Sequence, residues 1–131
     1  MRLVSKIIVH CADTPECAYF DIEDIRRWHT QERGFSDVGY HYVILLDGSI
    51  QIGRDLETIG AHCYGHNKSS VGVCYIGGKG GDTRTKEQKE SLKVLLKTLK
   101  RIYPIATIHG HRDFSDKDCP SFDATKEYKN L

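Results

Sequence analysis

The sequence predicts an α/β fold: one central mixed β-sheet flanked by helices, in a single domain. Short apolar runs rich in Val and Ile alternate with two segments of helical periodicity, which is typical of α/β domains. One further segment, 41–53, has the pattern of a β-hairpin. The chain has 131 residues and neither a repeat nor a linker, so we expect residues 1–131 to form one domain with its own buried core.

The first expected strand is the nearly continuous apolar run from Lys6 to Cys11. A run without polar alternation indicates burial on both faces, as in the middle of a sheet. A helix is expected to follow, with Asp21 as its N-cap and Gly34 at its end. One side of this helix carries the residues that we expect to face the core, namely Ile22, Ile25, Trp28 and His29.

The middle of the chain predicts a hairpin and another buried strand. His41 to Leu46 and Ser49 to Gly53 flank Asp47-Gly48, and Asp-Gly between β-rich runs suits a tight two-residue turn. Val71 to Ile76 is the buried strand, and a glycine-rich run, 77–81, closes it. This run lacks the spacing and the Lys-Ser/Thr ending of a P-loop, so we interpret it as a flexible loop rather than a phosphate site.

The last third of the chain predicts a long helix and a final strand. Thr85 and Gln88 form a capping-box pattern, and Pro104 ends the helix. Its apolar positions recur at helical spacing: Leu92, Leu95, Leu96, Leu99 and Ile102. Its basic residues are interpreted as a solvated outer face rather than a binding patch: Lys86, Lys89, Lys93, Lys97, Lys100 and Arg101. Ile105 to Ile108 is the last strand, and it leads into the polar segment 109–123.

Composition and charge disfavour several classes of protein. The net charge is +1, so no global field favours nucleic acid or an anionic membrane as a partner. No stretch approaches the ~20 apolar residues that span a bilayer, and the N-terminus lacks the pattern of a signal peptide, so we expect cytoplasmic synthesis. The five cysteines are odd in number and irregularly spaced, so we expect reduced thiols, with a local Cys11–Cys17 pair as the lesser alternative.

Side chains that bind soft metals stand where the expected strands end. His10 ends the apolar run of the first strand, and His111 and Cys119 flank one loop after the last strand. Each of these residues, taken alone, is more often a polar side chain without a metal. Because the ends of strands line up on one edge of a sheet, their convergence favours three ligands for Zn²⁺ with an open fourth position. That arrangement is typical of catalytic rather than structural zinc.

Tyr40, Lys117 and a polar loop are weaker candidates. Tyr40 begins an expected strand, where an aromatic residue is ordinary. Lys117 would be a surface lysine in most loops, but beside a metal its ammonium would direct positive charge toward a developing oxyanion. His62 and Asn67 lie in a polar loop that would either shape a groove or take part in chemistry.

Several sequence blocks, in a fixed order, carry a resemblance over nearly the whole chain. They are Ile8-Val9-His10-Cys11, Ile25-Arg26-Arg27-Trp28-His29, Asp37-Val38-Gly39-Tyr40-His41, Gly60-Ala61-His62, Gly110-His111-Arg112-Asp113 and Lys117-Asp118-Cys119-Pro120-Ser121-Phe122-Asp123. Through these blocks the chain resembles the zinc-dependent N-acetylmuramoyl-L-alanine amidases of the phage lysozyme-amidase type. This family shares its fold with peptidoglycan recognition proteins.

The resemblance implies an enzyme, a cofactor and a site. By similarity, His10, His111 and Cys119 fall on the zinc ligands of the family. Tyr40 and Lys117 fall on its two catalytic residues. The implied activity is hydrolysis of the amide bond between N-acetylmuramic acid and L-alanine in peptidoglycan. It is the activity of a phage-type endolysin, which acts on the cell wall after release.

The implied mechanism leaves some roles open. Lys117 would stabilise the tetrahedral oxyanion, whereas Tyr40 would hold the attacking water or assist proton delivery to the leaving amine. The sequence does not identify the group that first takes the proton of the water. Asp13 and Asp113 are candidates for orienting a ligand imidazole.

Two assignments have competitors. His111 is taken as the ligand rather than His109, because it stands eight residues before Cys119 in the matching block. The competing class of protein is a recognition module that holds a muropeptide without cutting it. Cys119 disfavours this class, because non-cleaving proteins of this fold commonly lack that cysteine. We expect a monomer, and docking of another protein on the N-terminal arm, residues 1–6, is the least favoured role.

Overall fold

The apolar run near the N-terminus forms strand β1, Lys6–Cys11, in the middle of a five-stranded sheet. It lies between β4, Ser70–Tyr75, and β5, Thr107–Gly110, and is parallel to both. The hairpin strands β2, Tyr42–Ile44, and β3, Ile50–Ile52, complete the order β3-β2-β4-β1-β5. Among the strands of residues 2–131 only β2 and β3 pair antiparallel, so the predicted mixed sheet is confirmed. The computed structural model describes residues 2–131.

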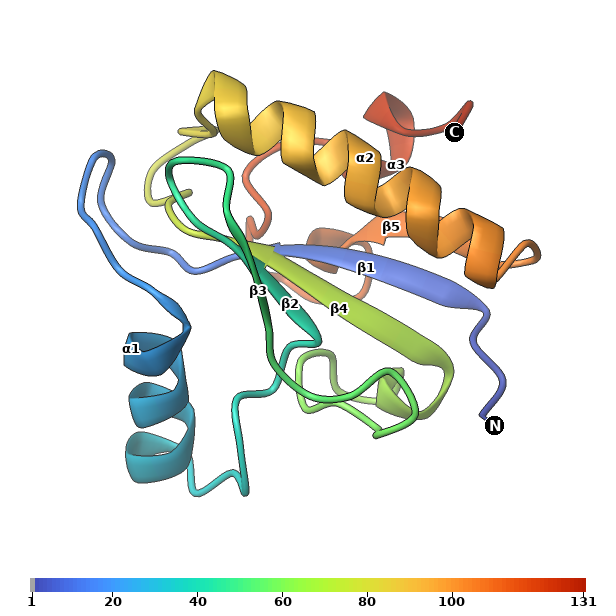
Figure 1. The fold of residues 1–131 in the computed structure, drawn as a ribbon, viewed down its shortest axis with the longest axis horizontal. Helices are drawn as coiled ribbons and strands as arrows, with labels where there is room; N and C mark the ends of the chain where they lie inside the picture. Colours follow the sequence, from blue (N-terminus) through green and yellow to red (C-terminus); the bar gives the residue numbers. More distant parts are fainter. Residues whose placement is uncertain (1) are drawn as a thin grey trace.

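Helices cover both faces of this sheet (Figure 1). Helix α2, Lys86–Ile102, packs on one face together with the short C-terminal helix α3, Ala124–Glu127, while α1, Ile22–Arg27, packs on the other. Since side chains alternate along a strand, Ile7 and Val9 point toward α2 and His10 points to the opposite face. The predicted α/β architecture with flanking helices is therefore confirmed.

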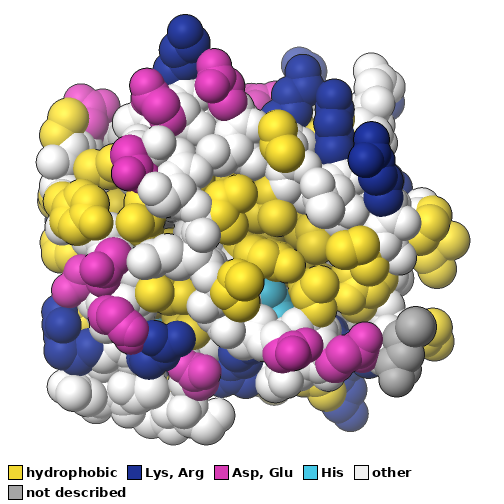
Figure 2. All heavy atoms as spheres, in the orientation of Figure 1, with side chains coloured by type: hydrophobic (Ala, Val, Ile, Leu, Met, Phe, Trp, Pro, Cys, Tyr) yellow, Lys and Arg dark blue, Asp and Glu magenta, His cyan; other side chains and the backbone are white. Residues whose placement is uncertain are grey.

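Helix α2 begins and ends where the sequence predicts. Thr85 accepts the N–H of Gln88, and the Gln88 side chain accepts the N–H of Thr85, which completes the capping box. Four of the five predicted apolar positions are buried: Leu92, Leu95, Leu96 and Leu99. The fifth, Ile102, is 51% exposed because the helix ends there. Lys and Arg side chains form a row over α2 in Figure 2, as expected of a solvated face.

The helix predicted from Asp21 to Gly34 is regular only in its first half. Asp21 caps α1 by accepting the N–H groups of Glu23 and Asp24, as expected. After Arg27 the chain widens into a π-helical turn over Trp28–Glu32. In that turn His29 is buried, and its Nδ1 accepts the N–H of Gly39 at 2.8 Å.

The predicted hairpin forms, but its two-residue turn is wrong. Gly48 donates its N–H to the carbonyl of Leu45, and Leu45 donates its own N–H to Ser49. The connection is therefore a three-residue loop, in which Gly48 takes the left-handed conformation at φ +87°. Asp47 accepts the N–H of Ser49, which favours the longer turn.

The last strand differs from expectation. Strand β5 begins at Thr107 rather than Ile105, because a turn from Tyr103 to Ala106 leaves Ile105 79% exposed. The N-terminal arm is partly packed: Arg2 Nε donates to the Leu56 carbonyl at 2.7 Å and Val4 is buried, whereas Leu3 is 85% exposed. Met1, which belongs to the same expected arm, lies outside the described residues.

All five cysteines are free, so the alternative Cys11–Cys17 disulfide does not form. No helix within residues 2–131 is long and apolar enough to cross a membrane.

Candidate metal centre and active site

Three side chains of the types that can bind a metal meet at the edge of the sheet where the parallel strands end. His10 stands near the end of β1, His111 directly follows β5, and Cys119 lies in the next loop. One ligand atom from each, two imidazole nitrogens and the sulfur, lies within 4.8 Å of the other two. The predicted convergence of these three residues is thus present in the fold.

Hydrogen bonds hold Cys119 in place against β1. Its Sγ accepts the backbone N–H of Cys11 at 3.1 Å and lies 3.9 Å from His10 Nδ1. Its carbonyl accepts the N–H of Arg112 at 2.7 Å, and the hydroxyl of Tyr75 donates to the carbonyl of Pro120. The loop that carries the thiol is therefore tied to β1, to β4 and to the segment that carries His111.

Burial favours the neutral form of both histidines. It lowers the pKa of His10 well below the ordinary value, and the neighbouring His62 and His111 lower it further. Burial and then the Lys117 ammonium also lower the pKa of His111. Contact with Cys11 and burial raise the pKa of the Cys119 thiol, whereas a nearby metal cation favours the thiolate. Neutral imidazoles can bind a metal directly, because their lone pairs are free.

A cavity of about 430 Å³ opens beside these three side chains. His111 and Cys119 line it, and Tyr40 and Lys117 line it as well. The Tyr40 ring lies 5.0 Å from that of His10, measured between centroids. Burial raises the pKa of Tyr40, so its hydroxyl is protonated at neutral pH. Lys117 is exposed at the edge of the cavity.

Comparison with known proteins identifies the family. The family model of N-acetylmuramoyl-L-alanine amidases matches residues 1–122. The endolysin of Enterobacteria phage K11 is 41% identical over 130 residues, covering 95% of this chain and 85% of the relative. The endolysin of Escherichia phage T7 is 41% identical over 122 residues, covering 89% of this chain and 80% of the relative.

The chain belongs to the N-acetylmuramoyl-L-alanine amidase family.

Solved structures agree with this assignment. The amidase LysC from Clostridium intestinale superposes with a TM-score of 0.85 at 28% identity, covering 96% of this chain and 82% of that one. Drosophila PGRP-LB superposes with a TM-score of 0.85 at 28% identity, covering 100% of this chain and 82% of that one. One of its mutants has been solved in complex with tracheal cytotoxin. The chain is accordingly an amidase of the endolysin kind, which hydrolyses the bond between N-acetylmuramic acid and L-alanine.

The structure does not support the predicted roles of Asp13 and Asp113 in orienting an imidazole. Within the described residues Asp113 contacts the Thr125 hydroxyl and lies 3.5 Å from His109 Nδ1, and no hydrogen bond joins it to His10 or His111. Asp13 lines the cavity, but within the described residues no hydrogen bond joins it to His10 or His111. His109 points away from the three-residue cluster, since its Nε2 lies 2.7 Å from the Thr107 hydroxyl.

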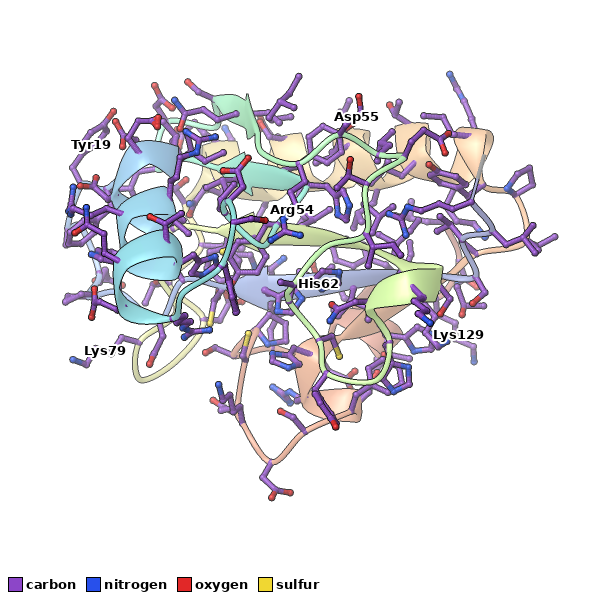
Figure 3. All side chains as sticks on the ribbon, turned by 90° about the horizontal axis from the view of Figure 1, so that it is seen from below. Tyr19, Arg54, Asp55, His62, Lys79 and Lys129 are labelled. Atoms are coloured by element: carbon purple, nitrogen blue, oxygen red, sulfur yellow. The ribbon has the colours of Figure 1, made fainter. Side chains whose placement is uncertain are left out.

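The structure also brings to the site residues whose position the sequence does not reveal. His29 and Arg33 line the cavity. His62, which Figure 3 labels, has its Nδ1 2.8 Å from His10 Nε2. Asn67 has a structural role, because its side-chain oxygen accepts the N–H groups of His62 and Cys63. Two sequence signals single out His62, namely the polar loop that contains it and the block Gly60-Ala61-His62 of the family resemblance, but neither predicts its contact with His10.

Proposed function

We propose that the amidase holds one Zn²⁺ with His10, His111 and Cys119 and cleaves peptidoglycan with Tyr40 and Lys117 as catalytic residues. The observation that carries the proposal is the cluster of three ligand atoms within 4.8 Å of one another beside the cavity. Two imidazoles and one thiolate suit zinc, and three protein ligands are the number found in catalytic sites. When bound, the ion supplies a Lewis acid that acidifies water to a pKa of about 7 and polarises a carbonyl.

The chain's own residues supply the remaining chemistry. The ammonium of Lys117 stands at the cavity edge, where it stabilises negative charge on the oxygen of the attacked carbonyl. The phenol of Tyr40 keeps its proton at neutral pH, so it orients the attacking water or gives a proton to the leaving amine. His10 and His111 stay neutral through burial, which keeps their lone pairs available.

We further propose that the whole chain is one amidase domain that acts on the cell wall as a monomer. Residues beyond the family match still belong to the core, since Ala124 and Tyr128 are buried in it. The three candidate ligands, Tyr40 and Lys117 gather around one cavity, so the proposed site needs no residue from a second copy of the chain. The net charge of +1 gives no support for a nucleic-acid partner. A non-cleaving recognition module is disfavoured because Cys119 is retained.

Metal removal tests the proposal. Purified peptidoglycan is incubated with the enzyme, with the enzyme stripped by a chelator, and with stripped enzyme resupplied with Zn²⁺, while newly freed L-alanine amino termini are counted. We expect release to stop after stripping and to return with zinc. Release that continues at the full rate after complete metal removal would contradict the proposal.

A further inference from the structure

The proposed ligand His10 has its second ring nitrogen buried against another histidine. His10 is 1% exposed, and its Nδ1 faces the sulfur of Cys119 at 3.9 Å. Its Nε2 lies 2.8 Å from Nδ1 of His62, and the two rings meet edge to face. No carboxylate of residues 2–131 makes a hydrogen bond or ion pair with either ring, so no negative charge stabilises a protonated imidazolium there. The two neutral imidazoles therefore share one proton between the facing nitrogens.

The contacts continue beyond His62 and end at a backbone carbonyl. His62 Nε2 lies 3.3 Å from the hydroxyl oxygen of Ser70. That hydroxyl donates to the carbonyl of His66 at 2.7 Å. A carbonyl oxygen has no proton, so the single proton of Ser70 must lie between the two oxygens. The hydroxyl oxygen of Ser70 is then left as an acceptor for His62.

The carbonyl of His66 determines which atom is the donor in each of these successive hydrogen bonds. Because Ser70 accepts, His62 carries its proton on Nε2 and exposes a lone pair on Nδ1. Because His62 Nδ1 accepts, His10 must carry its proton on Nε2. A neutral imidazole has only one ring proton, so Nδ1 of His10 keeps its lone pair. That is the nitrogen which faces Cys119.

Two glycines make room for the His62 ring. A Cβ at Gly72 would lie 2.6–2.8 Å from three atoms of the ring, and a Cβ at Gly60 would lie 2.7 Å from its Cδ2. Gly72 is in β4, two positions after Ser70, so strand alternation puts both residues on the face that His10 occupies. The ring is thus held between the strand and the loop, with little freedom to turn away from His10.

We propose that His62 and Ser70 are positioning residues that hold His10 in the Nε2–H tautomer and leave Nδ1 free for the metal. The inference rests on the proposed function, because it concerns a ligand of the proposed zinc. It assigns to His62 the part that a carboxylate or a backbone carbonyl usually plays behind a metal-bound histidine. Neither residue touches the reacting atoms.

The first test uses the unsubstituted, metal-free protein. Long-range ¹⁵N–¹H NMR correlations of its histidine rings distinguish the Nε2–H tautomer from the Nδ1–H tautomer. We expect Nε2–H for both His10 and His62. An Nδ1–H tautomer at His10 would overturn the inference, and this result does not depend on whether any variant folds.

The second test measures zinc affinity by competition with a chelator of known affinity. His62→Leu removes the acceptor for His10, and we expect it to weaken zinc binding about 10- to 100-fold. His62→Asn returns an oxygen to the place of Nδ1, and we expect its affinity to stay within about threefold of the unsubstituted protein. His66→Ala is the matched control, because it removes a ring from the same loop but keeps the backbone carbonyl that accepts from Ser70.

The outcomes separate this inference from the proposed function. If the unsubstituted protein binds no zinc, the proposed function fails and the inference fails with it. If it binds zinc, and His62→Leu binds zinc equally well, the inference alone is overturned. A loss shared by His62→Leu, His62→Asn and His66→Ala would also overturn it, because it would reflect disruption of the loop rather than loss of one acceptor.

Discussion

Lys117 offers a test of the chemistry that leaves the proposed metal ligands in place. The side chain is exposed at the cavity edge. Its ammonium helps to lower the pKa of His111, so its positive charge acts on groups inside the site. An ammonium ~4 Å from an oxyanion gains about 1 kcal/mol in bulk water and about 4 kcal/mol at an effective dielectric constant of ~20. An exposed position lies between these limits. We therefore expect Lys117→Met to cost about 2 kcal/mol, which is roughly a 30-fold loss of kcat/KM.

This loss is smaller than the factor of about 10²–10³ that follows removal of a donor from an enclosed oxyanion site. Water and ions screen an exposed charge, so the advantage of the unsubstituted enzyme over Lys117→Met should shrink as salt is raised from ~0.1 M toward ~1 M. Lys117→Arg keeps the positive charge, so it should retain most of the rate.

The assay is the initial rate of L-alanine amino-terminus release at saturating zinc, with zinc content measured on the same sample. Lys79→Ala is the matched control: it removes another exposed lysine, from the glycine-rich loop 77–81, whose side chain does not line the cavity (Figure 3). Its rate should be unchanged. If Lys117→Met kept the full rate at normal zinc content, the role assigned to Lys117 would be refuted.

Three further predictions follow from the structure. Cys119→Ser should fold, as judged by circular dichroism, but bind zinc far more weakly, and normal metal content in this variant would show that the ligand set is wrong. Ser70→Ala removes the proton that fixes the direction of the contacts behind His10, so NMR should detect both tautomers of His10, whereas a single Nε2–H form would contradict this. Burial lowers the pKa of His29 and of His41 to about 4, so the unfolded chain binds protons first as pH falls. The stability of the metal-free protein should therefore be intact above pH ~6.5 and decline toward pH ~4, and a flat denaturation midpoint across that range would exclude this contribution.

The sequence predicts the parts of the fold whose residue pattern is continuous. The run from Lys6 to Cys11 has no polar interruption before His10, and it forms the central strand at the predicted bounds. Helix α2 starts at the residue that the Thr85–Gln88 pattern predicts. Both signals are local, because they rest on strand burial and on the hydrogen bonds of one helix end.

Predictions that depend on distant contacts fail more often. Ile102 and Ile105 fit the apolar pattern, yet both are largely exposed, and a short pattern cannot distinguish single exposed apolar residues from core residues. The hairpin loop is one residue longer than its Asp-Gly sequence predicts. At the site, strand ends bring His10 near His111, as expected. The contact between His10 and His62 joins residues 52 positions apart and has no local signal.

The coordination of the metal tests the central claim most directly. X-ray absorption at the zinc edge, measured on protein purified with one equivalent of zinc, gives the identity and distance of the donor atoms. We predict one sulfur at about 2.3 Å and two imidazole nitrogens at about 2.0–2.1 Å, with a lighter atom completing four ligands. A shell without sulfur, or one made only of oxygen, would contradict the assignment of His10, His111 and Cys119.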